Sequence, residues 1–438
     1  MIFLYRALFL PLLLVSLPYY LLRMWRRGGY AKDFSHRFGC FTHLPTPKPE
    51  MQRIWLQAVS VGEVLAIAPL INALQDRGDV EIVLTTTTST AYAEARKRYT
   101  SSVLSVGIFP IDFWLFSSLA WQRIQPDVVI LTESELWPEH LHRAKRMGVP
   151  TFLINARLSD RSFARYKKLR PLAKRLLLKI EHIFAASDTD LKRFLELGSE
   201  LYRTTCTGNI KFDVAVPSAL SDARKAELKT ALGFNENDLI LLGSSTWPGE
   251  EASLIKIHQS LLNNGTNCSL LLVPRHAERG REIAEILDAQ ALPWHRRSSA
   301  QPITQKVRIH LADTTGELAN LSQIADLVFI GKSLSPNTGG QTPIEAAGLG
   351  KPIIMGTNMN NFKAIAHSLV HAGAGQYVAN FEELHKKCVA LLNDPIALAV
   401  MSDAAQAWHK KNQGSSQRIA ESIRVSVKED QSTADIYT

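Results

Sequence analysis

Short apolar runs alternate with longer amphipathic stretches along most of the chain. The runs over 54–59, 81–84, 128–131, 152–154 and 183–186 are predicted strands, and a second series follows over 239–243, 269–273, 307–311, 327–330 and 352–355. Predicted helices lie between them, for example over 63–75, from Pro138, and over 249–262 and 277–290. Buried apolar strands alternating with amphipathic helices are typical of parallel sheets covered on both faces. The sequence therefore predicts an α/β fold with two doubly wound, Rossmann-like domains.

These two series also predict the domain organisation. We expect a hydrophobic N-terminal anchor over residues 1–29, a first α/β domain over 30–207 and a linker over 208–237. A second α/β domain over 238–380, C-terminal helices over 381–425 and a disordered tail over 426–438 would follow. Two such domains in tandem predict a cleft between the carboxyl ends of the two sheets, which is where α/β proteins bind ligands.

The N-terminus carries sixteen uncharged, mostly apolar residues over 7–22. That length is marginal, because about 20 residues are needed to cross a bilayer. The basic residues that follow the run outnumber Arg6 before it, which argues against a cleaved signal peptide and favours a cytoplasmic C-terminal flank. We predict an uncleaved anchor that leaves residues 30–438 in the cytoplasm, and a buried N-terminal helix is the alternative.

Positive charge is concentrated in the first half of the chain. The 438 residues carry 50 basic and 41 acidic side chains, a net charge of +9. Residues 1–210 contribute 28 − 18 = +10 and residues 211–438 contribute 22 − 23 = −1. The segment Arg157–Lys179 alone holds nine basic residues against one acidic residue. This segment suits anionic lipid, with a solvated helix face as the alternative, and no regularly spaced aromatic residues indicate nucleic-acid binding.

Acidic residues follow two predicted strands of the first domain. Glu63 stands in Ser60-Val-Gly-Glu63 after the strand 54–59, where a carboxylate can act as a general base or favour a helix N-terminus. Glu133 and Glu135 follow the strand 128–131, and acid–base work or helix capping before Pro138 would each explain them.

Phosphate-binding candidates follow predicted strands of the second domain. Arg275 in Val273-Pro-Arg-His276 suits a phosphate or carboxylate, or is a surface arginine. The loop Gly339–Glu345 combines two glycines with Thr342 as a cap for a helix that begins at Pro343. Such a helix N-terminus can accept a phosphate, and Glu345 a ribose diol. Gly331-Lys-Ser333 is not a P-loop, because the required glycine is Asp326.

Taken in order, these motifs resemble one family. They are Trp55-Leu-Gln-Ala-Val-Ser-Val-Gly-Glu63, Glu133-Ser-Glu-Leu-Trp-Pro138, Asn155-Ala-Arg-Leu-Ser159, Gly208-Asn-Ile-Lys-Phe-Asp213, Ser245-Thr-Trp-Pro-Gly-Glu-Glu251, Val273-Pro-Arg-His276, Asp313-Thr-Thr-Gly-Glu-Leu318 and Gly339–Glu345. The set resembles the 3-deoxy-D-manno-octulosonic acid (Kdo) transferases of lipid A biosynthesis. The resemblance implies an inverting glycosyltransferase of the GT-B type at the cytoplasmic face of an inner membrane. Its first domain would bind the lipid A precursor, and its second CMP-Kdo as a co-substrate, with neither cofactor nor metal.

The resemblance also implies roles for individual residues. Glu63 matches the catalytic base, and Glu133 and Lys211 match positions that stabilise the transition state. The segments that would contact CMP comprise Pro274, Arg275, Thr315, Gly316, Glu317, Thr342, Pro343, Ile344 and Glu345.

The second domain departs from the family pattern at several positions. Lys332 replaces the second glycine of the usual Gly-Gly-Ser, and Gln341-Thr342 replaces the His-Asn of Gly-Gly-His-Asn. Trp247 stands for a histidine, Thr315 for a methionine and Ala346 for a proline. Two alternatives therefore stay open: another nucleotide-sugar enzyme, with a different donor sugar or an epimerase activity, and a non-catalytic, membrane-bound nucleotide-binding protein.

Overall fold

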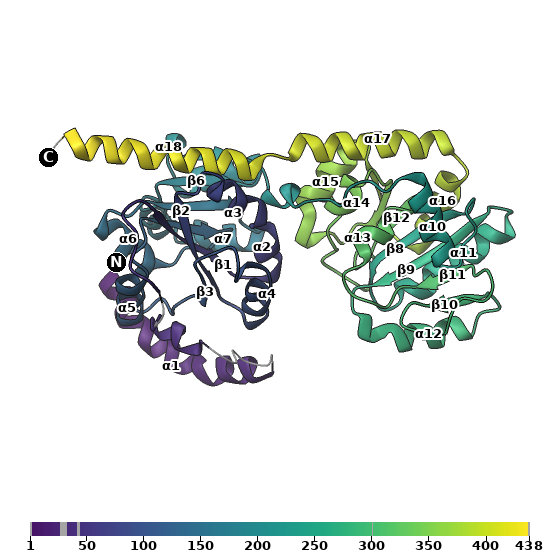
Figure 1. Cartoon of the computed structure of the whole chain (residues 1–438), viewed down its shortest axis with the longest axis horizontal. Helices are drawn as coiled ribbons and strands as arrows, with labels where there is room; N and C mark the ends of the chain where they lie inside the picture. The colour runs from purple at the N-terminus through teal and green to yellow at the C-terminus, as the bar shows by residue number, and fades with distance from the viewer. Residues whose placement is uncertain (1, 27–32, 42–43, 300, 437–438) are drawn as a thin grey trace. The chain divides into compact units, whose positions relative to one another are not determined.

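The chain forms two compact units, each built on a seven-stranded parallel sheet (Figure 1). The computed structural model describes residues 2–26, 33–41, 44–299 and 301–436, except for the side chains beyond Val425 and some in the first helix. The first unit comprises Met1–Val214 with Gln413–Thr438, and the second Ala215–Asn412. The predicted class, two doubly wound α/β domains, is confirmed.

The sheet of the first unit has the strand order β3-β2-β1-β4-β5-β6-β7. Its strands are β1 (Gln52–Ala58), β2 (Val80–Thr86), β3 (Ser105–Ile108), β4 (Val128–Thr132), β5 (Thr151–Ala156), β6 (His182–Ala185) and β7 (Thr204–Cys206). Ile54 of β1 pairs with Ile82 of β2 on one side and with Val128 of β4 on the other. The strand order therefore reverses between β1 and β4, which makes this the switch point of the first sheet.

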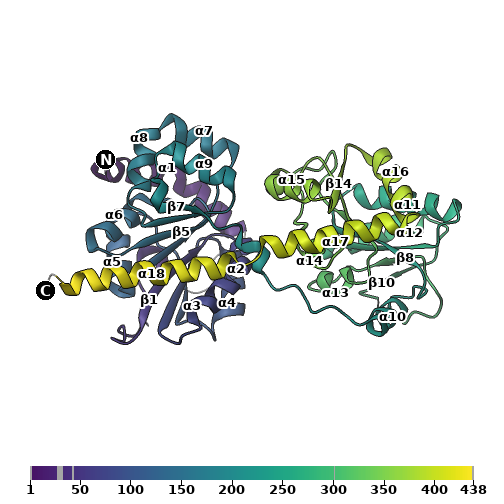
Figure 2. The same cartoon turned by 90° about the horizontal axis from the view of Figure 1, so that it is seen from above.

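Helices cover both faces of this sheet. The elements are α1 (Ile2–Arg26), η1 (Phe34–Phe38), α2 (Val61–Ala66), α3 (Ala68–Gln75), α4 (Ser89–Tyr99), α5 (Trp114–Ile124), α6 (Pro138–Met147), α7 (Asp160–Lys168), α8 (Arg170–Leu177), α9 (Asp188–Leu197), η2 (Leu201–Arg203), η3 (Ile210–Asp213) and α18 (Ser415–Ile436). One core joins the sheet to α2, α3, α4 and α18, and the other joins it to α5, α6, α8 and α9. Figure 2 shows α18 beside α3.

The second unit repeats this plan with the strand order β10-β11-β9-β8-β12-β13-β14. Its strands are β8 (Leu239–Thr246), β9 (Cys268–Pro274), β10 (Trp294–Arg296), β11 (Ile309–Leu311), β12 (Leu327–Ile330), β13 (Ile353–Gly356) and β14 (Gly375–Val378). Its helices are α10 (Asp222–Ala231), α11 (Glu250–Asn263), η4 (Ala277–Arg279), α12 (Gly280–Asp288), α13 (Leu318–Ser322), α14 (Ile344–Gly348), η5 (Asn360–Phe362), α15 (Lys363–His371), α16 (Phe381–Leu392) and α17 (Pro395–Asn412). The switch point of this sheet lies between β8 and β12.

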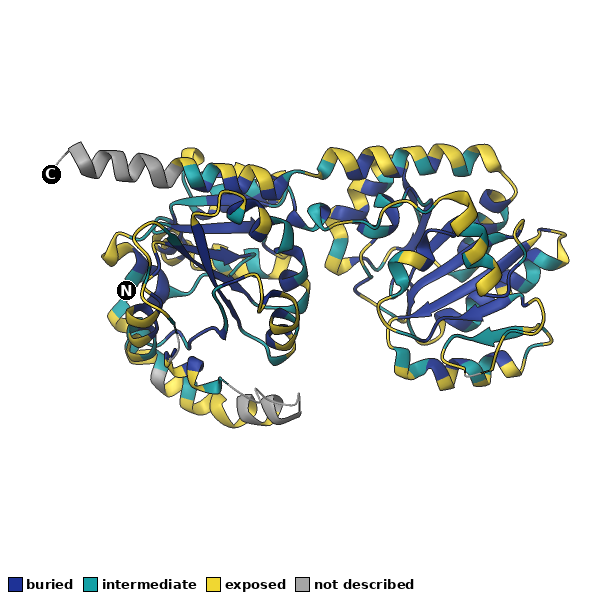
Figure 3. Cartoon of the chain, viewed as in Figure 1, coloured by how far each residue is buried: buried dark blue, intermediate teal, exposed yellow. Residues whose placement is uncertain are grey.

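All ten predicted strands are present, and the structure adds four. Those four, β3, β7, β10 and β14, are the edge strands of the two sheets. The central strands are buried almost throughout, as their colour in Figure 3 shows. The predicted helix over 63–75 is divided into α2 and α3 at Ile67. Pro69 explains the break, because proline lacks the N–H group that would continue the hydrogen bonding of α2, while it is tolerated in the first turn of α3.

The C-terminal part of the chain returns to the first unit. The chain enters the second unit at Ala215, within the predicted linker 208–237, which holds η3 and α10. The predicted C-terminal helices 381–425 correspond to α16, α17 and the first half of α18, and α18 continues into the predicted tail 426–438 as far as Ile436. The Asp213 carboxylate accepts hydrogen bonds from the backbone N–H groups of Gly414 and Ser416, both at 2.6 Å. This contact fixes η3 to the start of α18.

The first turns of α1 pack against the first unit through polar contacts. The Tyr5 hydroxyl donates to the buried Asp112 carboxylate at 2.7 Å, and the Arg6 guanidinium binds both oxygens of Glu139 at 2.7 and 2.9 Å. Among the described residues, no single helix meets the length and hydropathy expected of a bilayer span. Two bent helix pairs meet them jointly: the halves of α1, at 43°, and α16 with the segment Pro395–Val425, at 101°. Residues 27–29 of the predicted anchor lie outside the described residues.

Replacing Arg6 should destabilise the first unit. The Glu139 side chain is fully buried, so Arg6→Ala leaves its charge without the guanidinium. We expect a loss of about 2–4 kcal/mol in the free energy of unfolding, measured by denaturant titration. Arg98→Ala is the control, because its pair with Glu94 is partly exposed and should contribute less than about 1 kcal/mol. Equal losses for the two variants would contradict this account of α1.

Candidate active site

Three glutamates lie at the switch point of the first sheet. Glu63 stands in the helix that follows β1, and Glu133 and Glu135 follow β4, the neighbouring strand. Because parallel strands end at the same edge, the fold brings these three predicted candidates together. Ligands of open α/β sheets bind in the crevice outside the strand ends at such a point.

The Glu63 carboxylate is buried and accepts three hydrogen bonds. The backbone N–H of Val59 donates at 2.9 Å, the Ser60 hydroxyl donates at 2.7 Å, and the Thr132 hydroxyl donates from the end of β4. Ser60 in turn accepts from the Glu63 N–H at 3.3 Å, which completes a reciprocal helix cap. The predicted position of Glu63 in the first turn of a helix is therefore confirmed. The three hydrogen bonds leave the Glu63 carboxylate about one of its roughly four lone-pair sites for another proton donor.

Glu133 forms the centre of a charged cluster. Its Oε1 lies 3.2 Å from the Lys211 ammonium, and its Oε2 lies 3.6 Å from the Arg157 guanidinium. Its backbone is left-handed, with φ of 55°, and so is that of buried Asn155 on the adjacent strand, with φ of 48°. Left-handed backbone at residues other than glycine costs about 1–3 kcal/mol each and is concentrated at functional sites. The cluster therefore has the character of a site.

Glu135, which the sequence singles out only together with Glu133, is the third carboxylate at this switch point. Burial, followed by the nearby carboxylates of Glu63 and Glu133, raises the pKa of its carboxyl to about 7. With this pKa, the Glu135 carboxyl is about half protonated at pH 7. Its position two residues from Glu133 is the only signal in the sequence, and the effect of Glu63 depends on the pairing of β1 with β4.

The predicted donor residues of the second unit stand at strand ends of its sheet. Pro274 ends β9, and Arg275 is exposed, with its N–H donating to the carbonyl of Thr246 at 3.1 Å. Thr315 and Gly316 are exposed in the loop before α13.

Two further donor candidates have carboxylates. Glu317 pairs with Arg297 at 2.8 Å and accepts from the Thr314 hydroxyl, and the hydrogen bond from Arg297 lowers its pKa. Burial raises the pKa of Glu345. Glu317 thus has partners both in its own loop, at Thr314, and in the segment after β10, at Arg297.

The loop Gly339–Glu345 differs from the prediction in one respect. Helix α14 begins at Ile344, and Pro343 itself occupies the cap position. The Thr342 hydroxyl accepts from the Ile344 N–H at 3.4 Å, a long hydrogen bond. Gly339 and Gly340 have φ of 113° and 69°, so glycine is required there.

Glu250 is a second residue whose position the sequence did not explain. Its fully buried carboxylate accepts from the N–H groups of Trp247 and Lys332, both at 2.9 Å, and of Ser333 at 3.2 Å. It thereby joins the loops that follow β8 and β12 across the switch point of the second sheet. Burial raises its pKa to about 7.

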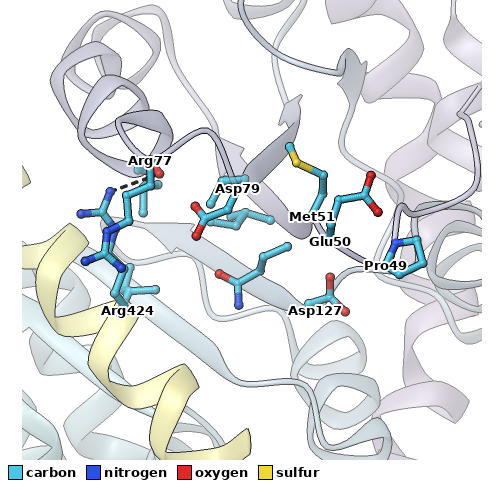
Figure 4. Close-up of a pocket in the computed structure, with 12 residues that line it drawn as sticks. Pro49, Glu50, Met51, Arg77, Asp79, Asp127 and Arg424 are labelled. Carbon is cyan, nitrogen blue, oxygen red and sulfur yellow. Dashed lines mark hydrogen bonds between the residues drawn. The ribbon is translucent and has the colours of Figure 1, made fainter.

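A cavity of about 320 Å³ lies away from these residues. It stands at the amino ends of β1 and β2 and is partly lined by α18 (Figure 4). Figure 4 shows Arg77 and Arg424 together on one side with Asp79 next to them, and Glu50 and Pro49 on the opposite side. Charged side chains of both signs line this cavity, and none of the predicted site residues is among the residues that line it.

No group of three or more His, Cys, Asp or Glu side chains suited to a metal ion is found in the part of the chain that the structure describes. Asp188-Thr-Asp190 has the acidic spacing Asp-x-Asp, but Asp190 accepts from the Leu158 N–H and the Ser187 hydroxyl as part of the α9 cap.

Two doubly wound α/β units in one chain, each with charged residues at the switch point of its sheet, define a GT-B-like fold. Residues 32–214 match the family model described as 3-deoxy-D-manno-octulosonic-acid transferase (kdotransferase). Curated relatives extend this match over almost the whole chain. The chain belongs to the Kdo transferase family and is a glycosyltransferase.

Two of these relatives are 3-deoxy-D-manno-octulosonic acid transferases. The one from Haemophilus influenzae is 30% identical over 426 residues, covering 96% of this chain and 98% of the relative. The one from Bordetella pertussis is 33% identical over 420 residues, covering 93% and 96%. Among solved structures, UDP-GlcNAc 2-epimerase from Neisseria meningitidis, bound to UDP-GlcNAc, has a TM-score of 0.59 at 14% identity and covers 85% of this chain and 99% of its own. That similarity concerns the fold.

The raised pKa of Glu135 predicts a pH dependence of stability. Its carboxyl binds a proton more tightly in the folded than in the unfolded state, so stability present below about pH 4.5 is lost as the pH rises through about 7. Glu135→Gln should therefore exceed the wild type by about 1–3 kcal/mol at pH 8 and match it near pH 4. Denaturant titrations at both pH values measure this. Glu196→Gln, at an exposed ion pair with Lys167, should follow the wild type. A constant difference across this range would argue against the assignment.

Proposed function

We propose that this glycosyltransferase moves Kdo from CMP-Kdo to a hydroxyl of a lipid A precursor with inversion at the anomeric carbon. The observation that carries the proposal is the cluster of Glu63, Glu133 and Lys211 at the first switch point, in a chain of the Kdo transferase family. Relatives that bear the name of Kdo transferases support the transferred sugar. The donor nucleotide and the acceptor follow from the resemblance of the motifs.

In the proposed step, Glu63 acts as the general base. The acceptor hydroxyl oxygen forms a bond to the anomeric carbon of Kdo while the bond from that carbon to the phosphate oxygen breaks. The hydroxyl proton passes to Glu63, and CMP leaves with the bonding electrons. Two of the three groups that hold Glu63 are hydroxyls, which can rotate and so free an oxygen lone pair.

Lys211 and Glu133 would act on the charge that develops in this step. The Lys211 ammonium, held 3.2 Å from Glu133, offers positive charge at the edge where the sugar reacts. In the second unit we assign CMP binding to Arg275 and to the segments Pro274–Arg275, Thr315–Glu317 and Thr342–Glu345. These residues supply cationic and polar contacts, and we propose that the step requires neither a metal ion nor a cofactor.

The enzyme is further proposed to act at the cytoplasmic face of the inner membrane. Helix α1 carries exposed apolar side chains, among them Phe3, Leu4, Leu12 and Val15. In Arg157–Lys179, the basic side chains of α7 and α8 are mostly exposed and stand beside exposed Leu169 and Leu172. Apolar side chains together with cations suit an anionic lipid surface and a phosphorylated lipid acceptor.

The function is tested by incubating the enzyme with CMP-Kdo and lipid A precursor and measuring the mass of the lipid product by mass spectrometry. We expect a product heavier by Kdo, no product with UDP-sugars, and undiminished transfer in EDTA. Glu63→Gln should lower transfer by about 10²–10⁴-fold while calorimetry still detects CMP-Kdo binding.

Ser60→Ala is the matched variant for Glu63. It removes one partner of the helix cap but keeps the carboxylate, so it should cost about 1 kcal/mol of stability and retain most of the transfer. Near-normal transfer by Glu63→Gln would refute its role as base. Tight CMP binding without any turnover would favour a non-catalytic protein.

Membrane association is tested by flotation with vesicles that contain phosphatidylglycerol. The full chain should float with these vesicles, and combined reversal of Arg161, Lys168 and Arg170 to Glu should lower binding about tenfold or more. The control reverses exposed cations of the second unit, namely Lys256, Arg281 and Lys386. Equal losses for both sets would indicate that net charge, and not the surface of α7 and α8, determines binding.

A further inference from the structure

Two departures from the family pattern meet in space at the second switch point. Trp247 follows β8 and Lys332 follows β12, and these neighbouring strands are where the order of the second sheet reverses. The Lys332 ammonium lies 4.1 Å from the centroid of the Trp247 ring, a cation–π contact. This position is the crevice in which open α/β sheets bind ligands.

Hydrogen bonds of their own backbone groups fix the positions of Trp247 and Lys332. Glu250 accepts from the N–H groups of Trp247 and Lys332, as described above, and the Asn337 side chain donates to the Pro248 carbonyl at 3.1 Å. The Lys332 carbonyl accepts from the Gly340 N–H at 2.9 Å, which ties it to the loop proposed to bind the nucleotide. These hydrogen bonds therefore fix the backbone from which the Lys332 side chain extends.

The lysine occupies this position at an energetic cost. Its φ of 60° is left-handed, a conformation that glycine adopts freely and other residues at about 1–2 kcal/mol. A glycine would serve the backbone better, so packing of the loop does not account for the side chain. Strained backbone of this kind is typical of functional positions.

The ammonium also retains capacity for a ligand. Among the residues that the structure describes, no carboxylate forms an ion pair with Lys332, and none accepts a hydrogen bond from its Nζ. An aromatic ring attracts the cation but leaves its three N–H groups available. The Trp247 ring also packs edge-on against His276 at 5.4 Å, next to exposed Arg275. Lys332 and Arg275 thus follow β12 and β9, the two strands that flank β8, and Trp247 follows β8 itself.

We propose that Lys332, oriented by Trp247, is a donor-binding residue that contacts an anionic oxygen of the nucleotide-activated sugar. The inference rests on the proposed function. In CMP-Kdo the oxygen belongs either to the phosphate or to the sugar carboxylate, and the two sources share the chemistry that an ammonium recognises.

The test measures binding of CMP and of CMP-Kdo to the full-length enzyme by calorimetry at low and high salt. Lys332→Met keeps the Cβ atom and the backbone strain but removes the charge, so it should weaken binding about tenfold and reduce the salt dependence. A loss with both ligands assigns the contact to the phosphate, and a loss confined to CMP-Kdo assigns it to the carboxylate. Trp247→Phe should bind more tightly than Trp247→Leu, because only phenylalanine keeps a ring face. Lys256→Met, at an exposed position of α11, controls for net charge.

Unchanged affinity and salt dependence in Lys332→Met would overturn the proposal. So would a lower melting temperature with unchanged affinity, because the cation–π contact would then be structural. If the wild type binds neither CMP nor CMP-Kdo, the proposed function fails separately, and the same variants measured with the nucleotide that the wild type binds decide the role of Lys332.

Discussion

A parallel sheet whose strand order reverses leaves a crevice at the reversal, and in both units one glutamate spans it. Glu63 stands in the helix after β1 and accepts from Thr132 at the end of β4. Glu250 stands in the helix after β8 and accepts from the N–H groups of Lys332 and Ser333 after β12. The loops that carry the proposed chemistry are positioned by these carboxylates, since loops at a sheet edge otherwise lack a common partner for their polar groups.

The sequence predicts the central strands well and the edge strands not at all. All four strands it missed are sheet edges, and their side chains are only partly buried, as in β7, where Thr205 and Cys206 are exposed. An edge strand pairs on one side only, so its residues need not be uniformly apolar. The return of α18 to the first unit was also beyond prediction. It depends on Asp213, which caps a helix about 200 residues further along the chain and lies two residues from Lys211.

The candidate site was predictable to the extent that its chemistry lies next to a strand end. Glu63, Glu133 and Arg275 could be selected because a carboxylate or guanidinium directly follows an apolar run. The partners of these residues come from other parts of the chain. Lys211 binds Glu133 from 78 positions away, and burial together with the Glu63 carboxylate raises the pKa of Glu135. No local pattern encodes these distances, because they follow from the order of the strands.

Glu63 and Glu250 occupy equivalent positions in the two sheets, yet the groups that donate hydrogen bonds to them differ in kind. Glu250 accepts from three backbone N–H groups, which are fixed by the strands, so its oxygens cannot be released without moving the loops. Glu63 accepts from one backbone N–H and from the hydroxyls of Ser60 and Thr132. A hydroxyl can turn its hydrogen elsewhere and can itself accept a hydrogen bond, so a proton can reach Glu63 while the sheet stays intact. When Glu63 takes up a proton, its hydroxyl partners can turn and accept from it, whereas proton uptake by Glu250 removes an acceptor from backbone N–H groups that cannot turn.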